Sequence, residues 1–225
     1  SHNTVVVNGL NQRETPQAAR TPAPGSDFLY FAADPDFQVA AVADRYAYPT
    51  STSRYRQTFL VSGWGRRRYA LSIFEVEGGV QHDQIFHAAS GRRERWRPNA
   101  ATIPADGSLL PPSIAFLSSA KPEEGRWFVQ AYGEFQPRHR AEVTGPSRVD
   151  LGLGDGSPPA LRLHLLGDSP ATLVTAESAD APTIPLAAPP PHATRSSLIV
   201  RRRSEAGANL SSRFVALFEP NEPGL

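Results

Sequence analysis

Histidine and carboxylate side chains are the metal-ligating groups available to this chain, because the sequence contains no cysteine. His2 stands directly before Asn3 and a β-branched run, residues 4–7, that closes on the turn-forming pair Asn8-Gly9. An imidazole held at the edge of such a strand can bind a metal ion. The lack of cysteine also excludes a disulfide framework and a thiol nucleophile, and it leaves the redox compartment open.

The remaining histidines do not form a complete metal site by their spacing; they are His82, His87, His139, His164 and His192. His82 and His87 are separated by an odd number of positions, which places them on opposite faces of a strand and out of line on a helix. A metal clamp made by this segment alone is therefore not expected. Instead, we expect His82 or Asp83 to cap a turn and His87 to pack beside the core.

Two common enzyme motifs are absent from the sequence: a G-x-S-x-G nucleophile elbow and a phosphate-binding glycine loop that opens a helix. The glycine-rich stretch at residues 152–156 is followed by Ser157-Pro158-Pro159. Prolines and a serine directly after the glycines predict a surface turn rather than a nucleotide site.

Arginine supplies nearly all of the positive charge, since Lys121 is the only lysine. It is concentrated at residues 66–68, at residues 92–97 around Trp96, and at residues 201–203. Guanidinium groups bind carboxylates and sulfates bidentately, and an adjacent indole can stack on a sugar ring, so the functional interpretation is a groove for an acidic polysaccharide. The alternative interpretation is that each cluster is a solvated hairpin tip or strand end.

The composition indicates a folded globular protein without a strong field for nucleic acid or membranes. Hydrophobic residues make up 40% of the chain and charged residues 20%, and the formal net charge is +1. No apolar run approaches the roughly 18 residues that cross a bilayer, and the polar N-terminus does not resemble a signal peptide. Neither nucleic acid nor membrane is therefore expected as a partner. Because the chain contains no methionine, we expect it to be the C-terminal piece of a longer protein.

Short runs with period-two alternation, separated by Gly, Pro and Asp, predict antiparallel strands with one buried face. The clearest pair is residues 55–62 and 69–76, joined as a hairpin by residues 63–66. Further strands are expected at residues 4–7, 28–31, 37–44, 85–88, 127–132, 161–166, 171–175, 197–200 and 214–218. This pattern predicts an all-β fold: an antiparallel β-sandwich of two large, supersandwich-like sheets.

Two proline-rich segments, residues 11–26 and 180–194, are predicted loops. The second one divides the chain in our interpretation. We expect residues 1–180 to form the sandwich, and residues 181–225 to form a proline-rich linker and a short C-terminal β-hairpin, Ser197 to Glu219, that packs on the sandwich.

Segments of the chain resemble, in order, motifs of the heparinase II/III family of polysaccharide lyases. Residues 1–9, SHNTVVVNG, are similar to that family's H-N-T-V-V-V-D-G stretch, with Asn8 where aspartate is usual. Residues 55–61 and 69–74 resemble its Y-R-R-x-h-h-h and h-h-V-D-h-F hairpin, where h is apolar and Ser72 stands at the common aspartate.

Two further segments continue the resemblance toward the C-terminus. Residues 78–87 are similar to the family's G-G-x-x-H-D-x-x-h-H segment. Residues 198–220 resemble its closing pattern, R-R followed by F-h-x-h-h-E-P. Each motif is modest alone, but four in the family's order, spread over nearly the whole chain, are a strong indication.

The resemblance implies an enzyme with an N-terminal α/α-toroid and a C-terminal antiparallel β-sandwich, of which this chain is the sandwich portion. It implies that His2 is one ligand of a zinc ion whose other ligands, a histidine and an aspartate, lie upstream. The catalytic acid and base would lie in the toroid and at the domain boundary, so no residue of this chain receives a catalytic role. A periplasmic or secreted enzyme is implied.

The implied reaction is a β-elimination in a uronic-acid-containing polysaccharide such as a heparan-type glycosaminoglycan or alginate. A base removes the C5 proton, an acid protonates the leaving oxygen at C4, and positive groups stabilise the carboxylate. This chain would contribute His2 and a groove wall, so the isolated fragment is expected to be inactive and not to hold zinc tightly. The alternative is a non-catalytic sandwich that binds carbohydrate through Trp64 and Trp96 in loops, or that packs against a partner domain.

Overall fold

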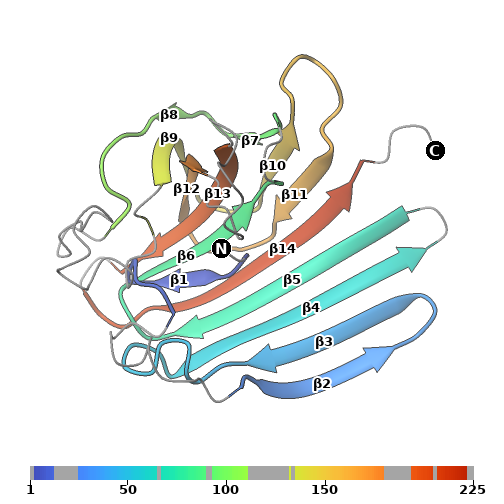
Figure 1. The fold of residues 1–225 in the computed structure, drawn as a ribbon, viewed down its shortest axis with the longest axis vertical. Helices are drawn as coiled ribbons and strands as arrows, with labels where there is room; N and C mark the ends of the chain where they lie inside the picture. Colours follow the sequence, from blue (N-terminus) through green and yellow to red (C-terminus); the bar gives the residue numbers. More distant parts are fainter. Residues whose placement is uncertain are drawn as a thin grey trace, which may run out of the picture.

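Alternating β-branched and aromatic residues form antiparallel strands throughout the molecule, as the sequence pattern predicts. The structure is a computed structural model that describes residues 3–12, 25–64, 67–89, 93–110, 132, 135–179, 194–204 and 207–221, with the main chain only at residues 64, 67 and 179. Within these residues no helix occurs, and so none is long and apolar enough to cross a membrane. Two large sheets face each other (Figure 1), which confirms the predicted antiparallel sandwich.

The first sheet has the strand order β1-β6-β13-β12-β9-β8. All of its neighbouring strands run antiparallel. The strands are β1 (Val5–Val7), β6 (Gln81–His87), β13 (Thr194–Arg203), β12 (Ala171–Ala179), β9 (Phe135–Val143) and β8 (Ile103–Pro104).

The second sheet has the strand order β2-β3-β4-β5-β14-β11-β10-β7 and is also antiparallel throughout. The strands are β2 (Asp27–Ala33), β3 (Phe37–Ala43), β4 (Arg54–Trp64), β5 (Arg67–Glu77), β14 (Ser211–Pro220), β11 (Leu161–Leu165), β10 (Ser147–Gly152) and β7 (Arg95–Pro98). Figure 1 shows β2, β3 and β4 extending beyond the region where the two sheets overlap.

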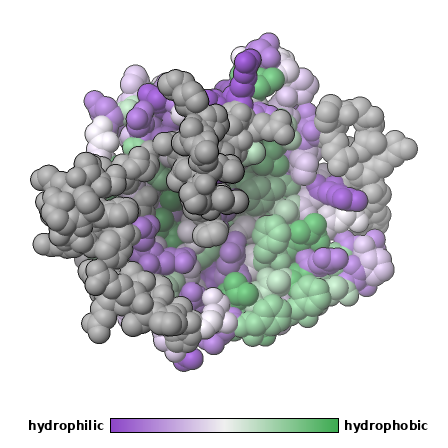
Figure 2. Space-filling view, viewed as in Figure 1, coloured by the Kyte–Doolittle hydropathy of each residue, from purple (hydrophilic) through white to green (hydrophobic). Residues whose placement is uncertain are grey.

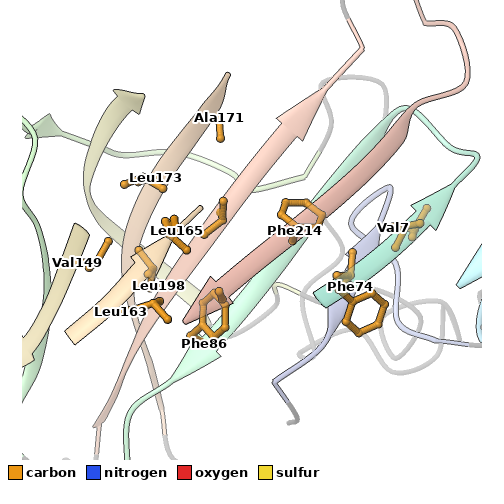
Figure 3. Packing of buried hydrophobic residues seen from close by; sticks show 14 of the residues in the cluster. Val7, Phe74, Phe86, Val149, Leu163, Leu165, Ala171, Leu173, Leu198 and Phe214 are labelled. Atoms are coloured by element: carbon orange, nitrogen blue, oxygen red, sulfur yellow. The ribbon is translucent and has the colours of Figure 1, made fainter. Parts of the chain in front are cut away.

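The main core lies between the two sheets and is made by every second residue of their facing strands. Phe74 and Phe214 come from the eight-stranded sheet, and Leu173 and Leu198 come from the six-stranded one (Figure 3). Each of these four side chains is almost fully buried. At about 25 cal/mol per Å² of buried apolar surface, this layer is the main source of stability.

A second hydrophobic cluster covers the other face of the six-stranded sheet. Val6, Ile85 and Ile199 point to this face, and Leu109, Leu110 and Tyr132 pack on them. The six-stranded sheet is therefore buried on both faces near β6 and β13, which explains why β6 reads as a run without clean alternation of buried and exposed residues.

The two C-terminal strands do not form the predicted hairpin. β13 lies between β6 and β12 in the six-stranded sheet, whereas β14 lies between β5 and β11 in the eight-stranded sheet. Both strands are long enough to be central, and each fills an internal position that buries its apolar residues better than an isolated hairpin would. Because the proposed linker falls at residues 180–193, outside the described residues, the domain boundary at residue 180 stays a prediction.

Most of the predicted strands are confirmed, including the pair β4 and β5, whose connection is shorter than expected because β4 continues to Trp64. Four strands were not predicted: β7, β8, β9 and β10. β9 reads FQPRHRAEV, so charged side chains fill its exposed positions and Pro137 interrupts the apolar pattern. The strand expected at residues 127–132 lies outside the described residues except for Tyr132.

The glycine-rich stretch forms the exposed turn that was predicted, and the Ser157 amide donates to Asp155 Oδ1 at 3.0 Å.

The overhanging strands expose an apolar surface that continues the inner face of the eight-stranded sheet. The cross-strand register places five large apolar residues on this face, which we call the apolar shelf: Phe28, Phe31, Val42, Phe59 and Val61. All five are exposed, from 37% for Val42 to 65% for Phe28. Figure 2 shows hydrophobic surface in the lower right, over the part of the sheet where these strands lie in Figure 1.

Candidate functional site

The beginning of the chain is tied to strand β6 by side-chain hydrogen bonds. The Asn3 Oδ1 atom accepts a bond from the His87 amide at 2.9 Å. Asn8, in a left-handed conformation with φ of 53°, accepts bonds from the amides of Val80 at 2.8 Å and Gln81 at 3.2 Å. His2, the predicted zinc ligand, and His192 lie outside the described residues. Among the residues that are described, no group of three metal-ligating side chains converges.

His82 is a structural histidine within β6, and its ring binds a carbonyl oxygen of the turn that precedes the strand, in agreement with the predicted turn cap. The ring is fully buried on the inner face of the sheet. Its Nε2–H donates to the Gly78 carbonyl oxygen, and its Nδ1 accepts from the Ser212 hydroxyl at 2.8 Å. Burial lowers the pKa of His82, which keeps the imidazole neutral.

His87 packs beside the core, as predicted. Its ring centroid lies 6.0 Å from that of Phe135, and its Nδ1 is 2.8 Å from the Ser197 hydroxyl. His87 points to the outer face of the six-stranded sheet while His82 points inward, which is the opposite orientation that their spacing predicts. The two rings therefore belong to different environments.

Asp83 and Arg201 form the most deeply buried ion pair among the described residues. They oppose each other on β6 and β13, with Nε to Oδ1 at 2.7 Å and Nη2 to Oδ2 at 2.9 Å. Gln81 donates to the same carboxylate at 2.7 Å, and the Tyr132 hydroxyl donates to it as well. Arg201 also donates to the Leu109 carbonyl oxygen at 2.6 Å. The network is closed and has no open coordination position, so it is structural.

The residues of the four family-like motifs meet in space. Tyr55 of the second motif donates its hydroxyl proton to the Val5 carbonyl oxygen of the first, at 2.6 Å. Asn8 of the first motif holds residues 80 and 81 of the third. Gly78 has a φ of 106°, and a Cβ there would lie 2.2 Å from the Ser51 oxygen, so glycine is required. Tyr55, Asn8 and Gly78 thus join neighbouring segments of the fold to one another.

The arginine cluster around Trp96 does not form the predicted polysaccharide groove. Trp96 lies in β7 with 4% exposure, so its indole cannot stack on a sugar. Arg95 is bound to Glu177 at 3.0 Å, and Arg97 donates to the Gly152 carbonyl oxygen. Arg95 and Arg97 are therefore bound by the protein itself, whereas Arg93 is exposed and Arg92 lies outside the described residues.

The cluster at residues 201–203 is also not the groove or the solvated strand end that the sequence suggested. Arg201 and Arg202 are buried, and Arg202 packs over the Phe214 ring at 4.9 Å, where burial lowers its pKa. Arg203 donates to Gln81 at 2.7 Å. These side chains belong to β13, whose central position explains their burial. In the cluster at residues 66–68, Arg68 is exposed, and the other two side chains lie outside the described residues, as does that of Trp64.

A different basic cluster lies on the outer face of the eight-stranded sheet, across β10, β11 and β14. In the cross-strand register, Arg148 opposes His164, and Arg162 stands between Asp150 and Glu219. His164 Nε2 lies 2.9 Å from Glu219 Oε2, with about one third of each side chain exposed. The carboxylate can only accept, so it fixes the ring with the proton on Nε2.

Asp150 forms ion pairs with both Arg148 and Arg162. Its Oδ1 atom lies 3.5 Å from Arg148 Nε and 3.8 Å from Arg162 Nε, both longer than a hydrogen bond. These three atoms are buried without hydrogen-bond partners in the described structure. Buried unpaired polar atoms cost free energy and mark a place where water or a ligand completes the arrangement.

A surface depression of about 630 Å³ opens beside this cluster. We call it the His164 depression; its polar lining consists of Asn99, Glu142, Thr144, Ser147, Arg148 and His164. The turn between β9 and β10 forms one wall and the end of β11 forms another. Its size is within the range of small-molecule sites.

The sequence did not single out this cluster. Arg162 and His164 share one face of β11, and Arg148 and Asp150 share one face of β10, so alternation is a usable signal once both strands are assigned. The contact of His164 with Glu219 joins residues 55 positions apart, which no local pattern reports.

No family model matches the chain, and no curated protein matches it. Among solved structures, the chain is similar to a galactose mutarotase related enzyme from Lactobacillus acidophilus, with 7% sequence identity and a TM-score of 0.37. The match covers 87% of this chain and 71% of that chain. This likeness assigns neither a family nor an activity to the chain.

Proposed function

We propose that this chain is the sandwich portion of a polysaccharide lyase of the heparinase II/III type, which cleaves uronic-acid-containing polysaccharides by β-elimination. The observation that carries the proposal is the contact between the family-like motifs. Asn8 binds the amides that follow Gly79, and Tyr55 binds the carbonyl oxygen of Val5. Motifs that are distant in sequence but interlock in the fold are expected of a shared ancestry rather than of chance matches.

In this proposal His2 is one ligand of a zinc ion, and the remaining ligands come from the rest of the enzyme. The described residues do not complete such a site, since no three ligating side chains converge among them. Catalytic acid and base likewise lie outside this chain. We therefore assign the chain the roles of supporting the active site and of forming a wall for the substrate, and we expect it to be inactive alone.

The apolar shelf is the surface that we assign to the partner portion of the enzyme, the α/α-toroid. Phe28, Phe31 and Phe59 are exposed on a sheet face that elsewhere forms the core. Contiguous exposed apolar surface of this kind is unusual for a free-standing domain and marks a contact with another domain. The enzyme would act in the periplasm or outside the cell, where polymeric acidic saccharides are accessible.

The test uses the full-length gene product, as wild type and as His2→Ala, with the metal measured by elemental mass spectrometry. Lyase activity is followed by the ultraviolet absorbance of unsaturated uronate product on heparan sulfate and on alginate. We expect about one zinc per chain in the wild type and a loss of both zinc and product in the variant. A folded wild-type protein with neither zinc nor product would overturn the proposal.

The second candidate function is a non-catalytic carbohydrate-binding module, and the His164 depression is the observation that favours it. The depression combines two hydrogen-bonding amide and hydroxyl side chains, Asn99 and Thr144, with the cation Arg148. Saccharide binding by a wild-type protein that contains no zinc and forms no product would favour the binding module over the lyase.

A further inference from the structure

We propose that the His164 depression binds the anionic group of an acidic saccharide, a carboxylate or a sulfate, with Arg148 as the principal contact. That the ligand is a saccharide rests on the proposed function, whereas the anionic group is inferred from the side chains themselves. The site lies where the turn between β9 and β10 connects the two sheets, with Arg148 and His164 on the outer face of the eight-stranded sheet, and β5 and β14 separate these strands from the apolar shelf.

Asp150 lies beside the guanidinium groups of Arg148 and Arg162, but it does not satisfy their hydrogen-bond donors. The shortest distance from Asp150 to each of them is to Nε, at 3.5 and 3.8 Å, beyond hydrogen-bond distance. Their terminal nitrogens make no hydrogen bond within the described structure. About two fifths of each side chain is exposed. A planar guanidinium with free terminal donors on a positioned stem is suited to bidentate binding of a carboxylate or sulfate.

His164 adds a second, oriented group to the same site. Glu219 binds its Nε2, so the other ring nitrogen, Nδ1, is available to the depression that His164 lines. In the neutral ring Nδ1 accepts a hydrogen bond from a hydroxyl group, and in the charged ring it donates one to an anion. Either state suits a polyhydroxylated anion.

The other polar residues of the lining match sugar hydroxyl groups. Asn99 can donate and accept, and Thr144 and Ser147 carry hydroxyls. The Ser147 hydroxyl is buried and has no partner in the described structure. Glu142 is bound by Thr172 at 2.8 Å and presents a carboxylate that accepts from hydroxyls but repels anions. The mixture favours one anionic group on a neutral polyhydroxylated body over a polyphosphate.

The test is isothermal titration calorimetry of the 225-residue chain with three hexasaccharides: a sulfated glycosaminoglycan fragment, an unsulfated uronate fragment and neutral maltohexaose. We expect the wild type to bind at least one of the two acidic probes and not the neutral one. The stronger of the two acidic probes identifies the anion as sulfate or carboxylate.

The variants are Arg148→Gln, Arg148→Lys and His164→Gln, with Arg213→Gln as the matched control. Arg213 is an exposed arginine of β14, near the end of that strand opposite to Glu219. We expect Arg148→Gln to weaken binding by about tenfold or more, because it removes a charge-assisted bidentate contact. Arg148→Lys should bind with intermediate affinity, and Arg213→Gln should bind as wild type.

Thermal unfolding of each variant confirms that the compared proteins are folded. Arg148→Gln binding as tightly as the wild type, equal loss in Arg213→Gln, or tight binding of maltohexaose would overturn the inference. Because the titration measures binding without catalysis, failure of the anion-site proposal can be distinguished from failure of the lyase proposal. The full-length protein could contain no zinc and form no product, which would overturn the lyase proposal. A selective loss of binding in Arg148→Gln would still support the anion site in that case.

Discussion

Arg201 and Asp83 face each other across β13 and β6 with two parallel hydrogen bonds of 2.7 and 2.9 Å, and they are 7% and 0% exposed. Burial alone would lower the pKa of Arg201, but the adjacent Asp83 charge outweighs it and raises that pKa above its ordinary value. Burial and the Asp83 charge raise the pKa of Tyr132 well above its ordinary range, so its hydroxyl stays a donor. The pair is therefore fully charged and fully bonded.

Removing one partner of this pair should be strongly destabilising. Arg201→Met leaves the Asp83 carboxylate buried without its counter-charge, and we expect a loss of about 3–5 kcal/mol in the free energy of unfolding. Urea denaturation measures it. The double variant Asp83→Leu/Arg201→Met should lose clearly less than the sum of the two single variants. Additive losses would show that the two residues are not coupled.

Acid should destabilise the protein through His82. The ring is buried neutral and its pKa lies below the ordinary value of 6.5, so the unfolded state binds a proton that the native state does not. Stability contributed by the neutral ring is present above pH 6.5 and is lost as the pH falls below it. Urea midpoints measured between about pH 7.5 and pH 5 should fall in the wild type. His82→Gln should show a flatter profile, and an equally steep one would contradict this assignment.

Alkali should destabilise the protein through Tyr55. Burial raises the pKa of Tyr55 from 10.0 to about 12, so the unfolded state loses its proton first. Stability is therefore unaffected below pH 10 and falls as the pH rises from 10 toward 12, by roughly 2–3 kcal/mol in total. Tyr55→Phe should reduce this fall, while the part due to Tyr132 remains. The same variant should cost about 1–2 kcal/mol at neutral pH, because the Val5 carbonyl oxygen loses a 2.6 Å bond.

Asn8 should be sensitive for two separable reasons, its side-chain oxygen and its left-handed backbone. Asn8→Ala loses both hydrogen bonds and strains the backbone, so we expect a loss of about 2–3 kcal/mol by urea denaturation. Asn8→Gly loses only the bonds and should lose about 1–2 kcal/mol. Asn8→Asp keeps an acceptor oxygen and should stay closest to the wild type. Equal stability of the alanine and glycine variants would show that the left-handed backbone at Asn8 does not contribute to the loss.

The apolar shelf should control self-association of the isolated chain. Phe31 and Phe59 are 59% and 42% exposed, so replacing either by serine removes only a partly buried ring and should cost about 1–3 kcal/mol, less than a core phenylalanine would. We expect the double variant to be less prone to aggregate, as measured by light scattering against concentration. A large loss of stability would instead mean that the shelf is covered within this chain.

The sequence predicted the fold where alternation is regular and failed where contacts are long-range. β4 and β5 were predicted as a pair because their apolar residues alternate across a short connection. β9 was missed because Pro137 and the three consecutive polar residues at 138–140 interrupt the alternation of apolar and polar residues. Which strands β13 and β14 adjoin depends on partners far away in the chain, and local patterns contain no such information.

The difference between local patterns and long-range contacts also explains which features of the candidate site were predicted. His82 was recognised as a poor ligand from its spacing, but its buried position depends on Ser212, 130 positions away. The arginine runs were read as surface features, although β13 buries two members of one run in the sandwich. The His164 depression combines β10, β11 and the turn before β10, and it became visible only when their register was known.

The placement of β13 and β14 has a consequence for how the protein is made. They are the last described strands to leave the ribosome, yet they occupy internal positions in the two sheets. Until they arrive, β5 and β6 each lack a neighbour and the layer between the sheets lacks Leu198 and Phe214. The earlier strands therefore stay incompletely paired until β13 and β14 have been synthesised, and the sandwich closes in one late, highly non-local step, which predicts slow refolding.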